Sequence, residues 1–260
     1  MTTHINKIHS LLSDMSSISL DQMDTVKLMR RVDSKFVLPF GKLYEVLKCL
    51  KNEYKVLEIK NEKWHKYSTQ YYDTIDLDMY HMHHNGRLNR YKVRQRCYNT
   101  SNANFLEVKF KNNKRETIKN RISTDNIESL NNRECNSFLK KFSPYLSNDI
   151  KPVLNNTFTR VTLVHKHIPE RVTIDFNLNF VPHKSTESVE LPGIGIIEVK
   201  RDFYEKKSTM ISTLKSLKIK ETGFSKYCIG TAMLNQNART NLFKSKIRNI
   251  NKINNGNLAF

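Results

Sequence analysis

Lysine and arginine occur at every second position in one short segment of the sequence. Residues 90–96 carry Arg90, Lys92, Arg94 and Arg96, and none of the positions between them is charged. Because side chains alternate between the two faces of a β-strand, a strand here would place all four cations on one face. Cations in such a row can bind several phosphate oxygens through charge-assisted hydrogen bonds. The residue types and their spacing therefore suggest the binding of a phosphate-rich anion.

Five further segments separate charged from apolar residues in the same way. A half-buried sheet with one solvated face would explain any one of them alone. A solvated face normally mixes both signs of charge, however, whereas these faces carry about a dozen cations against four carboxylates. Such a face would repel itself unless an anion neutralised it. The segments are 31–38, 105–111, 115–122, 171–178 and 194–200, and the carboxylates are Asp33, Glu107, Asp175 and Glu198.

A sheet that curls with its charged face inward would place the cations around a bound anion. We therefore predict an α+β fold: a closed antiparallel β-barrel with a cationic lumen and with helices packed on its apolar outer face. The few carboxylates among the cations can position a divalent metal. Strands are expected at 29–38, 66–74, 87–98, 105–111, 115–122, 153–166, 170–180 and 194–201, and helices at 42–51, 76–84, 126–141, 204–216 and 226–235.

The alternation also predicts which side chains of each strand face the lumen. In the segment 171–178 it assigns one face to charged and polar residues and the other to apolar residues. The chain is expected to have three parts: a helical or flexible segment at 1–24, the barrel domain at 25–235, and a basic, Asn-rich tail at 236–260 that is either mobile or a weakly docked helix. The lumen face of 171–178 has Arg171, Thr173, Asp175 and Asn177, and the outer face has Val172, Ile174, Phe176 and Leu178.

The composition also indicates an anionic partner. Lys and Arg total 44 against 25 Asp and Glu, a formal net charge of +19. Charge alone does not distinguish nucleic acid, an anionic membrane surface and a phosphate-rich ligand. The four cysteines are far apart, which excludes a C-x-x-C motif and is typical of free thiols in a reducing compartment. With no signal peptide and no apolar run of about 18 residues, a cytoplasmic location is expected.

Two other groups of residues could indicate a ligand site, but simpler roles account for them. His81, His83 and His84 lie in or beside a short predicted helix with no cysteine nearby, so packing explains them better than zinc. Four aromatic residues lie near basic ones, yet ordinary core packing explains them better than a platform for nucleic acid bases: Trp64, Tyr67, Tyr71 and Tyr72. We therefore expect no nucleic acid partner.

The motifs, taken in order, resemble the VTC domain, the polyphosphate polymerase domain of the vacuolar transporter chaperone. This family is a branch of the triphosphate tunnel metalloenzymes, which also include the CYTH enzymes. The resemblance covers roughly residues 25–235 and implies an eight-stranded antiparallel tunnel ringed by helices. The segments that carry it are 31–35 (RVDSK), 71–73 (YYD) with Asp76, 92–96 (KVRQR), 107–109 (EVK), 119–121 (KNR), 171–175 (RVTID), 197–200 (IEVK) and 224–227 (FSKY).

The resemblance implies transfer of the γ-phosphoryl group of ATP onto a growing polyphosphate chain, with Mn²⁺ or Mg²⁺ as cofactor. ATP and polyphosphate are then the expected partners, and coupling to export would require a separate membrane protein. The residues implied in catalysis are Lys35, Arg94, Arg96, Lys200 and Lys226; in phosphate binding, Arg31, Arg87, Lys92, Lys109, Lys119, Arg121, Arg160, Arg171 and Ser225; and in metal binding, Glu198, Glu107 and Asp175.

One departure from the CYTH pattern bears on the reaction. CYTH hydrolases begin with E-x-E-x-K, whereas this chain has Arg31, Asp33 and Lys35 at those positions. Fewer carboxylates weaken a second metal site, which favours a polymerase over a hydrolase that activates water through two metals. A triphosphatase of the same fold and a non-catalytic binder of polyphosphate or nucleic acid remain the alternatives.

Overall fold

The computed structural model describes residues 2–24, 31–114, 116–125 and 130–256. A few predicted features lie outside these residues: 29–30 of the first strand, Arg115, and the start of the helix expected at 126–141. Among the described residues, no helix is both long and apolar enough to cross a membrane.

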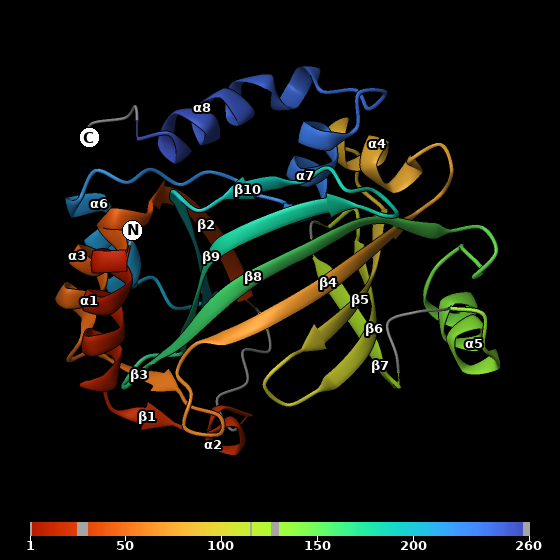
Figure 1. Cartoon of the computed structure of the whole chain (residues 1–260). Helices are drawn as coiled ribbons and strands as arrows, with labels where there is room; N and C mark the ends of the chain where they lie inside the picture. Colours follow the sequence, from red (N-terminus) through yellow and green to blue (C-terminus); the bar gives the residue numbers. More distant parts are fainter. Residues whose placement is uncertain (1, 25–30, 115, 126–129, 257–260) are drawn as a thin grey trace.

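One large sheet forms the centre of the molecule (Figure 1). Eight antiparallel strands lie side by side along its main path, as the alternation predicts. Short strands β3 (Tyr54–Leu57) and β10 (Val189–Leu191) extend it, and β1 (Ser17–Ile18) pairs with β3 in parallel. The main path is β2 (Arg31–Pro39), β11 (Ile194–Asp202), β9 (Glu170–Pro182), β8 (Lys151–His165), β4 (His65–Asp73), β5 (Arg90–Tyr98), β6 (Ala103–Lys111) and β7 (Thr117–Thr124).

The sheet curls but does not close, so the prediction of a closed barrel is wrong. Closure needs hydrogen bonds between the first and last strands of the path, and within the described parts of the chain β2 and β7 do not pair. The free edge of β2 is instead used by a later segment. Phe36 forms a bridge with Glu221, and the Thr222 N–H donates to the Lys35 carbonyl at 2.7 Å. The result is an open, curled sheet with one concave face.

Helices cover the convex, outer face of the sheet at two places along the strand order. On one side pack α1 (Thr2–Ser13), α3 (Leu43–Leu50) and α6 (Thr209–Ser216), which share one apolar cluster with β2, β8, β9 and β11. On the other side, α5 (Arg133–Phe142) packs on β5 and β6, and Asn132 caps it by accepting from the Cys135 N–H at 2.7 Å. The short helix α2 (Leu20–Asp24) lies beside β1.

A second apolar cluster fills one end of the concave face. Tyr71, Phe158 and Phe180 of the sheet are buried there together with Tyr227, from the helix that crosses this end. That helix is α7 (Lys226–Leu234), and α4 (Asp78–His84) and the C-terminal α8 (Lys244–Asn254) pack around it. The concave face is therefore apolar at the α7 end and charged along the rest of its length.

A β-bulge in β9 changes the face that its later side chains occupy. Thr159 pairs with Phe176 and Thr157 with Asn179, so β9 has one extra residue here, at Asn177, whose φ is +50°. Phe176 packs in the outer cluster, but Leu178 packs in the concave one. The prediction that Leu178 shares the face of Phe176 is therefore wrong, because strict alternation fails across a bulge.

The C-terminal part of the chain contributes a docked helix. Ile250 and Ile253 of α8 are buried in the concave cluster with Ile194 of β11. The backbone of Gly193 lies against the end of α8: its N–H donates to Asn254 Oδ1 at 2.8 Å, and a Cβ at this position would lie 2.4 Å from the Asn254 carbonyl oxygen. A glycine at 193 thus permits the close approach of α8.

Candidate phosphate-binding site

Cross-strand register brings the predicted cations onto the concave face. Lys92 lies opposite Lys109, which lies opposite Lys119, so three lysines cross β5, β6 and β7 in one row. Towards the β2 end of the strand order, Lys200 of β11 lies opposite Arg171 of β9. Lysines directly opposite one another destabilise a sheet unless a counter-charge is near. The rows therefore indicate a surface built for an anion.

Glu107 of β6 is the counter-charge for one group of cations. Arg94 donates to its Oε2 from Nε at 2.7 Å and from Nη2 at 2.6 Å, and Lys119 Nζ contacts its Oε1. The Glu107 side chain is fully buried. Burial alone would raise its pKa, but the charges of Arg94, Arg96 and Lys119 hold the pKa well below the usual range. Glu107 is thus ionised and held on both oxygens.

Asp175 of β9 has the same role beside the first residue of α7. Arg160 binds both of its oxygens, from Nε at 2.6 Å and from Nη2 at 2.8 Å, and Lys226 Nζ also contacts Oδ2. Although burial opposes ionisation, the Arg160 and Lys226 charges hold the pKa of Asp175 well below its ordinary value. Lys226 is the first residue of α7, so this group joins the helix to the sheet.

Glu198 of β11 forms the third group. Lys35 Nζ lies 3.3 Å from Oε1, and Lys200 Nζ contacts Oε2. The Glu198 side chain is 20% exposed, more than either of the other two carboxylates. Burial would raise its pKa, but Lys200 and Lys35 keep the pKa of Glu198 well below its ordinary value. This carboxylate is ionised and open to the concave face.

Arg96 and Lys92 differ from these cations because their hydrogen-bond partners are hydroxyl groups. Arg96 is 5% exposed, and its Nε donates to Thr69 Oγ1 at 3.2 Å. Lys92 Nζ donates to Ser225 Oγ at 2.7 Å. The guanidinium of Arg96 also lies 5.7 Å from the ring centroids of Tyr67 and Phe158. Both cations can therefore donate to a phosphate without first leaving a carboxylate.

Several lysines of this face have a lower pKa than ordinary lysines, so they lose their proton more readily. Burial, the largest cause, lowers the pKa of Lys92, Lys119 and Lys226 to about 8. The pKa of Lys109 is also well below its ordinary value, first because of the charge of Arg94 and then because of burial. An arriving phosphate would reverse these shifts, because an opposite charge favours the ammonium form.

Three predicted phosphate ligands lie at the edges of this arrangement. Arg31 is at the start of β2 and pairs with Asp33 at 3.2 Å, where both side chains are about one-third exposed. Arg121, on edge strand β7, lies 4.6 Å over the Phe105 ring. Arg87 is exposed in the turn before β5, and its carbonyl accepts from Arg90 Nη1. The structure does not bring Arg87 into contact with the three carboxylate groups.

The aromatic support of these cations was missed from the sequence. The Phe158 ring lies 4.3 Å from Lys226 Nζ and 5.3 Å from the Arg160 guanidinium, and Tyr67 lies 5.1 Å from the same guanidinium. The predicted core role of Tyr67 holds, since it packs in the concave cluster, but the ring also faces Arg96 and Arg160. The pairing of His65 with Arg160 across β4 and β8 places Tyr67 and Phe158 beside them, and sequence alone does not give that register.

A second missed residue is Asp73, at the end of β4. It is fully buried and accepts from the N–H groups of Thr74, Met79 and Tyr80 at 2.8–2.9 Å, and from Tyr227 Oη. It therefore ties the start of α4 to α7, next to Lys226. The resemblance includes Asp73 in a motif but gives it no role.

The predicted metal ligands fit a metal only in part. Glu107 and Asp175 each have both oxygens held by cations, whereas Glu198 is partly exposed between two lysines. Among the described residues, no three His, Cys, Asp or Glu side chains form a group that could hold an ion. Mg²⁺ and similar ions commonly use one carboxylate together with substrate phosphates and water. Glu198 suits that role, and a metal here would take its other ligands from phosphate and water.

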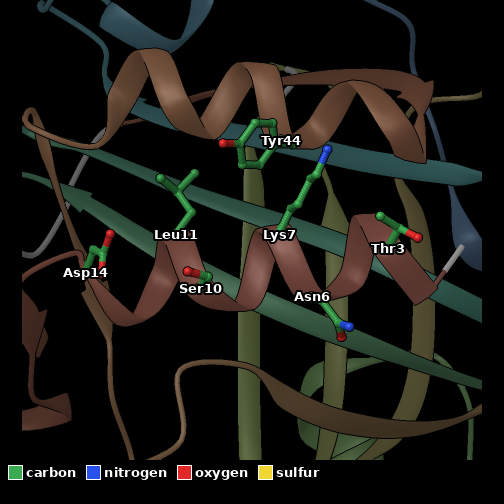
Figure 2. Close-up of a pocket in the computed structure, with 7 residues that line it drawn as sticks. All are labelled: Thr3, Asn6, Lys7, Ser10, Leu11, Asp14 and Tyr44. Atoms are coloured by element: carbon green, nitrogen blue, oxygen red, sulfur yellow. The ribbon is translucent and has the colours of Figure 1, made fainter.

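Figure 2 shows a hollow away from the concave face. It has a volume of about 480 Å³ and lies between α1 and α3, on the outer side of the sheet. Tyr44 and Lys7 meet across it, with Lys7 Nζ 6.0 Å from the ring centroid. Its lining has one cation and one carboxylate, Lys7 and Asp14, which gives it none of the surplus positive charge of the concave face.

The position and order of these side chains agree with a known family. The sequence model of the VTC domain matches residues 30–235. The chain belongs to the VTC domain family. The match includes every residue that the resemblance assigned to the site, and it ends before α8. No curated protein matches the VTC chain in sequence.

Two solved structures are similar to this VTC chain. A proposed adenylate cyclase from Bacillus halodurans is 12% identical, with a TM-score of 0.50 over 75% of this chain and 94% of that chain. A proposed adenylyl cyclase from Hippeastrum, described as having a dominant triphosphatase activity, is 15% identical, with a TM-score of 0.49 over 79% and 96% of the two chains. At these identities the likeness concerns the fold.

Proposed function

We propose that this VTC domain is a polyphosphate polymerase, which transfers the γ-phosphoryl group of ATP onto the end of a polyphosphate chain. The observation that carries the proposal is the surplus of cations on the concave face. Six cations hold the three carboxylates there, which leaves a net charge of 6 − 3 = +3 before other cations are counted. Lys92 and Arg96 add to it with hydroxyl partners. A long chain of phosphates would neutralise this surplus.

In the proposed reaction, a terminal phosphate oxygen of the chain forms a bond to the γ-phosphorus of ATP. The bond from that phosphorus to the β–γ bridging oxygen breaks, and ADP leaves with the electron pair. The guanidinium groups of Arg94, Arg96 and Arg160 would bind the equatorial oxygens, where charge is spread in the transition state. Lys226, at the start of α7, would hold a neighbouring phosphate. Mn²⁺ or Mg²⁺ bound at Glu198 would neutralise negative charge on the phosphates.

The amount of positive charge favours a polymer over a single triphosphate as the ligand. The cations extend from Lys35 and Lys200 on β2 and β11 to Lys119 on β7, at opposite ends of the strand order. A triphosphate would contact part of this surface. Arg31 adds to the positive side, in the position where CYTH hydrolases have a carboxylate.

The test is the product formed from ATP. The purified chain with ATP and Mn²⁺ should release ADP and form a polymer that runs as a ladder on a gel, with little orthophosphate at early times. Orthophosphate without a ladder would identify a triphosphatase. No consumption of nucleotide with Mn²⁺ or Mg²⁺ would leave a non-catalytic binder of polyphosphate as the better account.

Arg31→Glu tests what divides transfer to phosphate from transfer to water. The change restores the carboxylate of the CYTH pattern beside Asp33, and we expect the product to shift from polymer towards orthophosphate. Lys42→Glu, an exchange at a partly exposed lysine in the 3-10 turn that follows β2, is the control and should leave the product unchanged. If Arg31→Glu gives the same product as the wild type, Arg31 does not determine whether the phosphoryl group is transferred to phosphate or to water.

Within this proposal, ATP and polyphosphate are the partners and the chain acts in the cytoplasm. Export of the product would then depend on a separate membrane protein.

A further inference from the structure

The C-terminal helix α8 lies outside the segment that matches the VTC domain, yet it packs against the site. Ile250 and Ile253 are buried in the concave apolar cluster, and α8 contacts both β2 and β11. The hydrogen bond from the Gly193 N–H to Asn254 Oδ1, at 2.8 Å, fixes the end of the helix. The position of α8 relative to the sheet is therefore set by packing as well as by chain connection.

This packing turns one lysine of α8 towards the start of α7. The half-buried Lys246 has its Nζ 3.7 Å from the point that a Cβ at Gly223 would occupy. Gly223 lies two residues before Ser225, whose side chain caps α7 by accepting from the Cys228 N–H at 3.3 Å. By contrast Lys244, Arg248 and Lys252 of the same helix are exposed.

Lys246 belongs to a group of cations at this position. Burial raises the pKa of Cys228, on the first turn of α7, while the charges of Lys92 and Arg90 act to lower it. Lys35 is close enough to Lys246 for its charge, after burial, to lower the pKa of Lys246. Lys92 Nζ donates to the capping hydroxyl of Ser225 at 2.7 Å.

This group repels itself when no anion is bound. Burial and the charges of Lys92, Arg90 and Lys35 lower the pKa of the neighbouring His83 to about 2, so His83 is neutral and adds no charge of its own. Glu198 pairs with Lys35 and Lys200. A phosphate bound here would receive hydrogen bonds from cations on β5 and α8, beside the positive end of the α7 dipole.

We propose that Lys246 of α8, together with Lys92, forms a further phosphate-binding position, which holds a phosphate of a long chain beyond those bound at Arg94, Arg96 and Arg160. The inference rests on the proposed function in one respect, that the ligand is a chain of phosphates. It assigns to α8 a part in the choice between short and long ligands, because we expect a triphosphate bound at the three arginines to end before Lys246.

Equilibrium binding of two probes, tripolyphosphate and long-chain polyphosphate, tests this position. Lys246→Ala should weaken long-chain binding about fivefold to tenfold, the loss expected for one charge-assisted contact, and should change tripolyphosphate binding less than about twofold. Lys246→Arg should keep the long-chain affinity. Lys252→Ala, on the exposed side of the same helix, removes the same charge and should change neither.

Equal losses for Lys246→Ala and Lys252→Ala would overturn the proposal, because they would reflect net charge alone. An unchanged long-chain affinity, or the same loss for tripolyphosphate, would also overturn it. Lys246→Met keeps most of the aliphatic stem and replaces the alanine variant if that variant does not fold. The assay uses neither nucleotide nor metal, so a wild-type protein that binds both probes but makes no polymer would contradict the proposed function and leave this position standing.

Discussion

The Arg160 guanidinium binds both carboxylate oxygens of Asp175, with Nε 2.6 Å from Oδ1 and Nη2 2.8 Å from Oδ2. Because Lys226 contacts the same carboxylate, this pair connects β8 and β9 to the first residue of α7. One buried carboxylate thus positions two cations that come from distant parts of the sequence.

Replacement of Asp175 should destabilise the ligand-free protein more than the ligand-bound protein. Asp175→Asn leaves Arg160 and Lys226 buried beside each other without their counter-charge, which costs about 3 kcal/mol in the free energy of unfolding. Tripolyphosphate should restore part of that loss, because its oxygens replace the carboxylate. Urea denaturation with and without tripolyphosphate measures both effects. Asp33→Asn, at a more exposed pair, should cost less than about 1 kcal/mol, and an equal loss in both variants would contradict the assigned role.

Arg96 and Arg94 should differ when each is replaced by alanine. Arg96→Ala removes a cation whose hydrogen-bond partner is a hydroxyl, so triphosphate binding should weaken about tenfold with a smaller loss of thermal stability than in Arg94→Ala. Arg94→Ala also leaves Glu107 with Lys119 as its contacting cation, so a negative charge is exposed to the ligand. We expect a larger loss of affinity and a lower Tm. Calorimetry and thermal unfolding measure the two quantities, and equal behaviour of the two variants would argue against this difference in partners.

Glu198→Gln should separate phosphate binding from metal-dependent turnover. The change keeps the shape of the side chain and removes its charge, so binding of tripolyphosphate without metal should be kept or become tighter. Turnover of ATP that depends on Mn²⁺ should be lost, because the one partly exposed carboxylate of the three groups is gone. Glu190→Gln, at a solvent-exposed position on β10, is the control. Wild-type turnover in Glu198→Gln would exclude Glu198 as the metal ligand.

Affinity and stability should change in opposite directions above about pH 8. Lys92, Lys119 and Lys226 each have a pKa of about 8, so they lose their charge there and triphosphate binding weakens as the pH rises. In the unfolded chain these lysines keep their protons up to about pH 10.4, and more protons bound by the unfolded state means that stability rises with pH over this range. The ligand-free protein should therefore become more stable between about pH 8 and 10.

Lys226→Arg provides the comparison for this pH dependence. Arginine keeps its charge throughout this range, so the decline in affinity should be smaller than in the wild type, and titration of the ligand itself affects both proteins equally. Binding curves at several pH values measure the difference. Parallel declines in the two proteins would show that Lys226 does not titrate near pH 8.

The alternation of residues was enough to predict the eight strands of the main path and most of the concave face, but not the short strands β1, β3 and β10. The row at 90–96 lies on β5 as expected, and its partners Glu107 and Lys119 follow from the same period of two on β6 and β7. The exceptions arise where an interaction between strands decides the outcome. At Asn177 a bulge reverses the face, and the sequence shows no break in alternation there.

Closure and the end of the cationic face could not be predicted in the same way. Whether the first and last strands meet depends on strand tilt and shear, which side-chain alternation does not contain. The edge of β2 is used by Thr222, more than 180 residues later, and the apolar end depends on how α7 and α8 pack. The contacts of Asp73 with α4 and α7 likewise exist only after folding, since Tyr227 lies 154 positions away.

The open sheet described above has a consequence for ligand topology. Over the described residues no strand pairing joins β2 to β7, so the hydrogen-bonded strands do not form a complete ring around a ligand on the concave face. A closed tube admits a polymer by threading, whereas an open groove can take up an internal stretch of it sideways. Ring-shaped phosphates, which have no end to thread, should therefore compete with linear polyphosphate for this surface.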